Sequence, residues 1–242
     1  MSSLKRTASG PLRRKSSYKK SKSYVSKPKS PFYARSSNRK TVVNLGTTIP
    51  DATVVKLKYC DDIVVSVPNI ATGSNYLFRC NSIYDPDQSS IGHQPLGHDQ
   101  WAAFYQRYVV TKATITATFK TQQDGVNGTN VGICTIANVG ETISSPDSFM
   151  ESNRTSYAYV SPQVGVTSVS KTFYPNHFFG NDNIIDDDSK GAIFGSNPID
   201  GAYWQLKMWH PNQSNPVPHT CYVNVAITYE CVLRERKEIP AS

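Results

Sequence analysis

The stretch Cys221-Tyr-Val-Asn-Val-Ala-Ile-Thr-Tyr-Glu-Cys-Val232 decides the fold, because its side chains alternate in character along most of its length. One face collects apolar and aromatic residues, namely Cys221, Val223, Val225, Ile227, Tyr229 and Cys231. The opposite face collects polar residues, namely Asn224, Thr228 and Glu230. Successive side chains of a β-strand point to opposite faces, so this period of two predicts a long strand with one buried face.

The same alternation recurs upstream in Val55–Tyr59, Lys112–Lys120 and Ala202–Trp209. Weaker strand candidates are 75–83, 130–139, 156–160 and 166–174. Eight strands joined by loops of uneven length predict an all-β fold, a single eight-stranded antiparallel jelly-roll sandwich. A seven-stranded immunoglobulin-like sandwich is the alternative, and it is disfavoured because its Cys…Trp…Cys order is not found.

Two short helices interrupt this pattern. The first is expected after Asp99 as its cap, with Trp101, Phe104, Tyr105 and Tyr108 sharing one face. The second is expected over 145–150, opened by Pro146.

Charge is distributed unevenly along the 242 residues. The chain has a formal net charge of +8, yet the first 40 residues hold 13 of the 26 Lys and Arg and no acid. The remaining 202 residues carry 13 basic and 18 acidic side chains, a net charge of −5. The basic residues of the first 40 are Lys5, Arg6, Arg13, Arg14, Lys15, Lys19, Lys20, Lys22, Lys27, Lys29, Arg35, Arg39 and Lys40. This asymmetry predicts a basic arm on an ordinary folded body.

The arm, residues 1–45, is rich in Ser, Lys and Arg and poor in aliphatic side chains. Such a segment buries too little apolar surface to offset its ordering entropy, so we expect it to be disordered. Residues 46–242 then form one domain. The 13 cations are predicted to bind nucleic acid by neutralising phosphates, and Tyr18, Tyr24, Phe32 and Tyr33 can stack on unpaired bases.

Part of the arm also has the form of a bipartite nuclear localisation signal, made of Arg13, Arg14, Lys15, Lys19, Lys20 and Lys22. Importin is the partner that such a signal implies. Ser16 and Ser17 directly follow the first basic group, a spacing that basic-directed kinases accept, and a phosphate there would weaken binding to a genome.

The five cysteines are odd in number and form no Cys-x-x-Cys pair. We interpret them as reduced core residues of an intracellular protein. The sequence shows neither a secretory signal nor an apolar run of membrane-spanning length.

Catalytic motifs are not found in the sequence, so we expect no enzyme and no cofactor. His93 and His98 are interpreted as residues of a loop that packs at a subunit contact, since their spacing does not favour a metal site. Asp182 and Asp186–Asp188 are interpreted as a solvated loop, with a calcium site as the alternative.

Aromatic residues exceed what one sandwich core readily hides. Tyr203, Trp209 and Tyr222 fall outside the expected core positions. Tyr and Trp are enriched at protein interfaces. A subunit interface is predicted for the aromatic segment that contains Phe173, Tyr174, Phe178 and Phe179.

A further block runs Ile83-Tyr-Asp-Pro-Asp-Gln-Ser-Ser-Ile-Gly-His-Gln-Pro-Leu-Gly-His-Asp-Gln-Trp101, followed by Tyr105-Gln-Arg-Tyr108 and Val110. With the basic arm, it resembles the capsid proteins of small circular single-stranded DNA viruses, the circovirus-like group. There, a Q-P-x-G…W…Y…Y…V block joins strands C and D. The arm of this chain mixes Lys with Ser and lacks long unbroken Arg runs.

This resemblance implies a capsid protein of which sixty copies form an icosahedral T=1 shell around a single-stranded DNA genome. The arm would line the interior, and the protein would occur in the virion and, during assembly, in the host nucleus. A host receptor is implied but not identified. The strands would map as B 53–66, C 75–83, D 108–120, E 130–139, F 156–160, G 166–174, H 202–210 and I 219–232, with sheet B-I-D-G facing sheet C-H-E-F.

Two alternatives remain from the residues alone. One is the capsid protein of a small RNA or satellite virus, which would use the same arm chemistry on a different genome. The other is a cellular nucleic-acid-binding protein with a basic tail and a β-sandwich.

Overall fold

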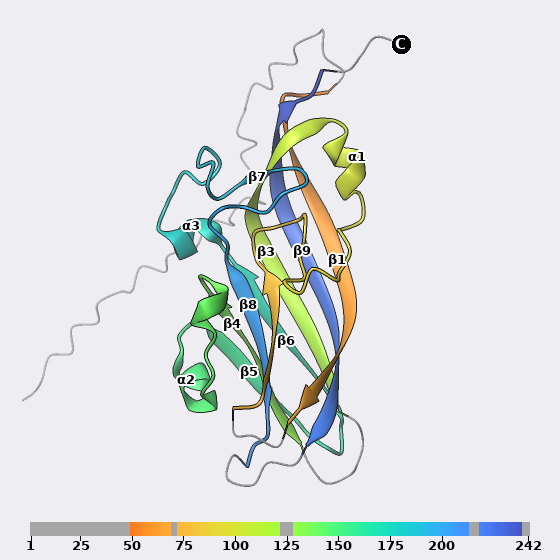
Figure 1. Ribbon diagram of the computed structural model, residues 1–242, viewed down its shortest axis with the longest axis vertical. Coiled ribbons are helices and arrows are strands. Elements are labelled where there is room, and N and C mark those ends of the chain that lie inside the picture. The colour runs from red at the N-terminus through yellow and green to blue at the C-terminus, as the bar shows by residue number, and fades with distance from the viewer. Residues whose placement is uncertain (1–48, 69–71, 122–127, 213–217, 239–242) are drawn as a thin grey trace, which may run out of the picture. The chain divides into compact units, whose positions relative to one another are not determined.

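The computed structural model describes residues 49–68, 72–121, 128–212 and 218–238 (Figure 1). The arm predicted for residues 1–45 lies outside the described residues. No helix in the described part of the chain is long and apolar enough to cross a membrane.

Strands make up most of the described chain. They are β1 (Ala52–Val67), β2 (Ser74–Arg79), β3 (Tyr105–Thr121), β4 (Thr129–Ile136), β5 (Thr155–Val160), β6 (Val166–Phe173), β7 (Ala192–Ile193), β8 (Tyr203–Trp209) and β9 (His219–Arg236). The helices are α1 (His98–Ala102), α2 (Pro146–Glu151) and α3 (Pro175–Phe179), with a 3-10 turn at Val139–Glu141.

Two antiparallel sheets form a sandwich. One has the strand order β1-β9-β3-β6, with the two-residue β7 added to β3, and the other has the order β2-β8-β4-β5. With the long strands lettered B to I in chain order, these orders are B-I-D-G and C-H-E-F. The jelly-roll prediction is therefore confirmed. All eight predicted strands are present, although the second ends at Arg79 instead of residue 83 and the last continues to Arg236.

The strand β9 is central to the first sheet because it pairs along its length with two neighbours. It pairs with β1 from Ala52↔Arg234 to Val67↔His219, and with β3 from Tyr105↔Arg236 to Thr121↔Cys221. All six apolar positions predicted for its inner face are buried. Each such side chain contributes about 1.5–3 kcal/mol on burial, so the alternation drives the docking of β9 against the second sheet.

Three buried tyrosines tie the core to the loops around it. The hydroxyl groups of Tyr105, Tyr108 and Tyr229 donate to the carbonyl oxygens of Pro50 at 2.9 Å, Ser196 at 2.9 Å and Arg79 at 2.8 Å. A buried hydroxyl without a partner is costly, so these bonds allow the phenol rings to fill the core while fixing three chain segments.

The outer face of β8 is covered, which corrects the interpretation of Trp209 as a surface aromatic. The segment with the 3-10 turn and α2 packs on it, and Trp209 meets Phe149 of α2 edge-on at 5.6 Å between ring centroids. A Cβ added at Gly132 of β4 would lie 2.7 Å from the Phe149 ring. Glycine at this position therefore allows α2 to approach the sheet. Figure 1 shows α2 beside β4 and β5.

Polar side chains fasten the same segment to β8. The backbone N–H of Ile143 donates to Gln205 Oε1 at 2.9 Å, and Gln205 Nε2 donates to the Ile143 carbonyl at 2.8 Å. The buried ammonium group of Lys207 donates to the carbonyls of Thr72 and Ser144 at 2.6 and 2.8 Å. Burial lowers the pKa of Lys207 to about 8.

The first helix differs from its prediction. It begins at His98 after Gly97, whose φ of 92° favours glycine, and Asp99 lies inside its first turn without acting as the cap. The predicted shared face is also wrong, because Tyr105 and Tyr108 belong to β3 and pair with β9. Long-range strand pairing with a buried side chain outweighs the local helical spacing there.

The cysteines divide into two groups. Cys80, Cys134, Cys221 and Cys231 are buried, as expected for core residues, whereas Cys60 is exposed on β1. The expectation that all five are core residues is therefore wrong for Cys60, whose side chain lies on the outer face of the strand.

Candidate interaction surfaces

The residues predicted to bind nucleic acid, and those predicted as the nuclear localisation signal, all lie outside the described residues. Two surfaces of the described body carry side chains that suit binding to a partner. One is a pocket at the edge of the sandwich, and the other is a row of exposed apolar side chains on the outer face of the β1-β9-β3-β6 sheet.

The aromatic segment predicted as an interface lies at the end of β6. Phe173 is only 2% exposed and meets Trp204, Phe178 and Phe179 edge-on, at 6.5, 5.3 and 6.1 Å between ring centroids. The structure therefore places Phe173 in the chain's own core. Phe178 and Phe179 are half-buried against that core.

A short helix, α3, holds this segment in place, and the sequence interpretation missed it. Pro175 occupies its first turn, and Gly180 ends it with a φ of 66°. Proline at the start and glycine after the end are the ordinary helix signals, so both cues were present in the sequence. Within the segment Tyr174 is the most exposed aromatic, at 47%, and it offers the most area to a partner.

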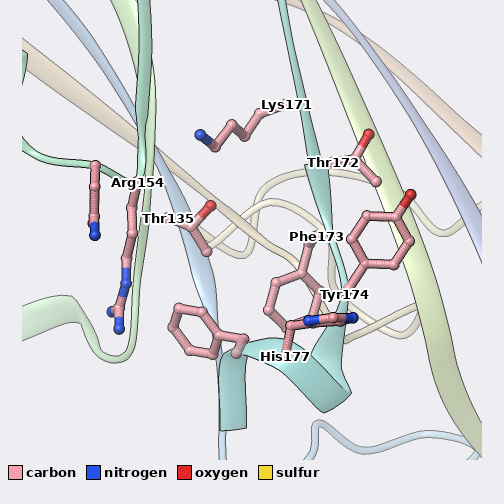
Figure 2. A pocket seen from close by; sticks show the side chains of 9 residues that line it. Thr135, Arg154, Lys171, Thr172, Phe173, Tyr174 and His177 are labelled. Carbon is pink, nitrogen blue, oxygen red and sulfur yellow. The ribbon is translucent and has the colours of Figure 1, made fainter. Parts of the chain in front are cut away.

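The edge pocket is a cavity of about 250 Å³ where β4, β5, β6 and α3 meet. Its lining residues are Thr135, Asn153, Arg154, Lys171, Thr172, Phe173, Tyr174, His177 and Phe178. Figure 2 shows Arg154 and Lys171 on one side of the pocket, and Tyr174 and His177 on the other. The lining set contains basic, aromatic, hydroxyl and amide side chains and no carboxylate.

Positive charge in this pocket is not neutralised by the described residues. The guanidinium group of Arg154 lies 4.9 Å from the centre of the Phe178 ring. No carboxylate in the described ranges forms an ion pair with Arg154 or Lys171, whereas Arg79, Lys190 and Arg234 each pair with an aspartate. Desolvation lowers the pKa of Lys171.

The apolar row crosses all four strands of the first sheet in one line of the register. Val64 lies opposite Tyr222, Tyr222 opposite Lys120, and Lys120 opposite Val166. Val64 is 65% exposed, Tyr222 45% and Val166 44%. Together with the neighbouring strand residues, this row borders a cavity of about 290 Å³ that is predominantly apolar. Tyr222 was indicated by the sequence, while Val64 and Val166 were not.

A polar strip follows the row along the same face. Hydroxyl pairs join β3 to β6 at Thr114–Thr172, Thr116–Ser170 and Thr118–Ser168, with oxygen–oxygen distances of 3.2, 2.8 and 2.8 Å. In each pair the two hydroxyl groups are hydrogen-bonded to each other across the strands. The strip therefore leaves the apolar row as the part of this face that gains most from leaving water.

The acidic loop is engaged within the chain. Asp188 pairs with Arg107 at 2.8 Å and with Arg234 at 2.9 Å. Asp187 accepts hydrogen bonds from Ser189, which lower the pKa of its carboxyl group. Among the described residues no group of three or more His, Cys, Asp or Glu is arranged to hold a metal ion. The loop that was interpreted as solvated therefore also forms ion pairs within the chain.

The two loop histidines are also engaged. His93 stacks on Tyr59 at 4.7 Å, and buried His98 lies with Nδ1 3.0 Å from Asp99 Oδ1. These contacts lie within the chain, and the subunit contact expected for the loop stays a prediction.

No protein-family model matches the sequence, and no curated protein matches it significantly. Similar solved structures are of viral capsids. Turnip yellow mosaic virus shares 9% identity over 81% of this chain and 87% of that chain, with a TM-score of 0.42. A 60-mer capsid protein of BFDV, a circovirus, shares 7% identity over 80% of this chain and all of that chain, with a TM-score of 0.45. Mud crab tombus-like virus shares 11% identity over 82% of this chain and 96% of that chain, with a TM-score of 0.42. The likeness is one of fold, and it does not single out the circovirus-like group.

Proposed function

We propose that this chain is a viral capsid protein that assembles into an icosahedral shell of sixty copies and packages single-stranded DNA through its basic arm. The observation that carries the proposal is the partition of charge, with 13 cations and no acid in the first 40 residues and a net charge of −5 in the rest. A polyanion is attracted to the arm and repelled on average by the body.

The arm supplies affinity without sequence selectivity, since Lys and Arg bind phosphates and release condensed counterions. Sixty arms would bring 60 × 13 = 780 positive charges to the interior of one shell. Charge matching of this size supports packaging of a short genome. The same chemistry binds RNA, so nuclease sensitivity of extracted cargo distinguishes a DNA virus from an RNA or satellite virus.

The same arm would carry the protein into the nucleus through importin, using Arg13, Arg14, Lys15, Lys19, Lys20 and Lys22. Import precedes assembly in this scheme, because cations engaged by a genome are no longer available to a carrier. A host receptor would meet the outer surface of the shell.

The body would supply the subunit contacts. The row of Val64, Tyr222 and Val166 fits a second copy of this chain, because these apolar side chains are exposed in one line of the register, with Lys120 of β3 between Tyr222 and Val166. Tyr174 at the rim of the edge pocket is a further contact candidate. Tyrosine combines large apolar area with a polar tip and is enriched at such interfaces.

Replacing Tyr222 with glutamate is expected to lower the assembled fraction at least tenfold, because a charge would be buried in the middle of the apolar contact. The chain itself should still fold, since Tyr222 is half-exposed. Size-exclusion chromatography and negative-stain microscopy of the expressed protein measure the assembled fraction, and circular dichroism checks the fold.

Ile199→Glu is the matched control, since Ile199 is 85% exposed and lies in a loop away from the row. It should assemble like the unchanged chain. Normal particles from Tyr222→Glu, or equal loss in both variants, would remove the row from the interface. Absence of particles from the unchanged chain over a range of salt concentrations would instead favour the cellular nucleic-acid-binding alternative.

A further inference from the structure

The edge pocket gathers cationic side chains that the described body leaves unpaired. Arg154 follows the α2 segment, and Lys171 comes from the inner side of β6, where the two sheets open at their edges. Lys56, Lys112 and Lys190 are held by carboxylates instead, within 3.3 Å. A cavity lined by an arginine, a lysine and no acid attracts an anion.

The other residues that line the pocket indicate which class of anion it would bind. Thr135 and Asn153 offer a hydroxyl and an amide donor, which suit the oxygen atoms of a phosphate. Tyr174 and His177 place aromatic faces at the opposite side, with ring centroids 5.9 Å apart. Aromatic side chains stack on unpaired bases at about 1–3 kcal/mol per base. The combination fits a phosphate with an attached planar base.

The edge pocket is small, so it can hold at most one small ligand. Its volume of about 250 Å³ is below the roughly 300–1,000 Å³ of pockets that enclose drug-sized ligands. Phe173 and Phe178 close its floor, and Arg154 is held over the Phe178 ring. The guanidinium plane is therefore preorganised, which lowers the entropy lost on binding.

We propose that the edge pocket binds one nucleotide of a single strand, with Arg154 and Lys171 holding the phosphate and Tyr174 stacking on the base. This inference rests on the proposed packaging function and deepens it. The arm would collect the strand through many exchangeable phosphate contacts, and the pocket would fix one nucleotide at a defined place on each subunit.

The test uses the full chain and 5-bromodeoxyuridine monophosphate as the probe, with photo-crosslinking and mapping of the crosslinked peptides. The unchanged chain should give a crosslink in the peptide that contains Tyr174. The double variant Arg154→Gln with Lys171→Met should lower that yield at least tenfold, while Lys171→Arg should retain most of it. Lys120→Met is the matched control on the outer face of β3 and should crosslink like the unchanged chain.

Competition separates a nucleotide from a simple anion. Thymidine monophosphate should suppress the crosslink at a concentration at least tenfold lower than inorganic phosphate, and Tyr174→Leu should abolish that preference. Equal competition by both, or an unchanged crosslink in the double variant, would overturn the inference. Circular dichroism identifies a variant that does not fold, in which case Lys171→Arg and Tyr174→Leu carry the test.

Particles distinguish the two proposals from each other. If particles of the unchanged chain contain no nucleic acid, the packaging function fails regardless of the pocket. If they contain nucleic acid substituted with bromodeoxyuridine but crosslink only outside the pocket, the nucleotide site fails and the packaging function stands.

Discussion

Raising the pH from 8 to 11 will strongly destabilise the reduced, unassembled body, because three buried thiols keep protons that the unfolded chain releases. Burial raises the pKa of Cys80, Cys221 and Cys231, that of Cys221 to about 12. An unfolded thiol titrates near pH 8.5. Each therefore contributes stability that is present below that pH and lost above it, at about 1.4 kcal/mol per pH unit.

Two other kinds of group modify this loss. Lys207 and Lys171 act in the opposite sense, because burial lowers their pKa values, that of Lys207 to about 8. Between its lowered pKa and about pH 10.5, each of these lysines holds its proton only in the unfolded chain. Buried Tyr108 and Tyr229, whose pKa values are raised by burial, add to the loss above about pH 10. Three thiols against these lysines leave a net loss of about 1.4–3 kcal/mol per unit. Two or three units would remove about 3–8 kcal/mol, which is comparable with the lower part of the roughly 5–15 kcal/mol of a typical domain.

Urea unfolding of the reduced protein at a series of pH values measures this loss. Cys80→Ala should remove one of the three thiol contributions and flatten the alkaline slope. Cys60→Ser is the matched control at an exposed thiol and should leave the slope unchanged. A free energy of unfolding that stays constant from pH 8 to 10 would contradict the assignment of buried thiols to the core.

Binding of the full chain to single-stranded DNA will weaken steeply with salt. Contacts with a single strand give a slope of log K against log salt of about −0.7 for each phosphate neutralised, so 13 engaged cations predict roughly −9. A fourfold rise in salt would then lower the affinity by a factor of about 10⁵. Fluorescence anisotropy with a labelled homopolymer at several salt concentrations gives the slope.

Glutamine at Lys19, Lys20 and Lys22 should reduce the magnitude of that slope by about 2, in proportion to three lost cations. Glutamine at Lys56, Lys58 and Lys120 is the matched control with three lysines of the body. If the control variant changes the slope as much as the arm variant does, the body and not the arm provides the phosphate contacts.

The sandwich could be predicted from the sequence because each long strand has one face in the common core. Along β9 the inner positions from Cys221 to Cys231 are apolar and several outer positions are polar, so period-two alternation reports burial. The same reasoning fails on β8, where Gln205, Lys207 and Trp209 form the outer face and are buried as well. Their cover is the α2 segment, about 60 residues earlier in the chain, and alternation along one strand contains no information about it.

The candidate sites show the same division between local and long-range information. Tyr222 was identifiable as an outward aromatic on a predicted strand. Its partners in the row, Val64 and Val166, belong to strands whose register depends on the sheet order. The edge pocket joins Thr135, Arg154 and Lys171 from three strand regions. The aromatic residues around Phe173 could be recognised in the sequence, but their packing in the core could not. The residue types could be identified from the sequence, but predicting which of them meet in one site required the strand order and register of the sheets.

The nucleic-acid content of purified particles tests the central claim most directly. Particles from the full chain and from a chain lacking residues 1–40 are compared by absorbance ratio and by nuclease digestion after disruption. Full-length particles should protect single-stranded DNA, and the truncated chain, with all 13 arm cations removed, should give shells nearly empty of nucleic acid. Equal nucleic acid per subunit in the two preparations would contradict this claim.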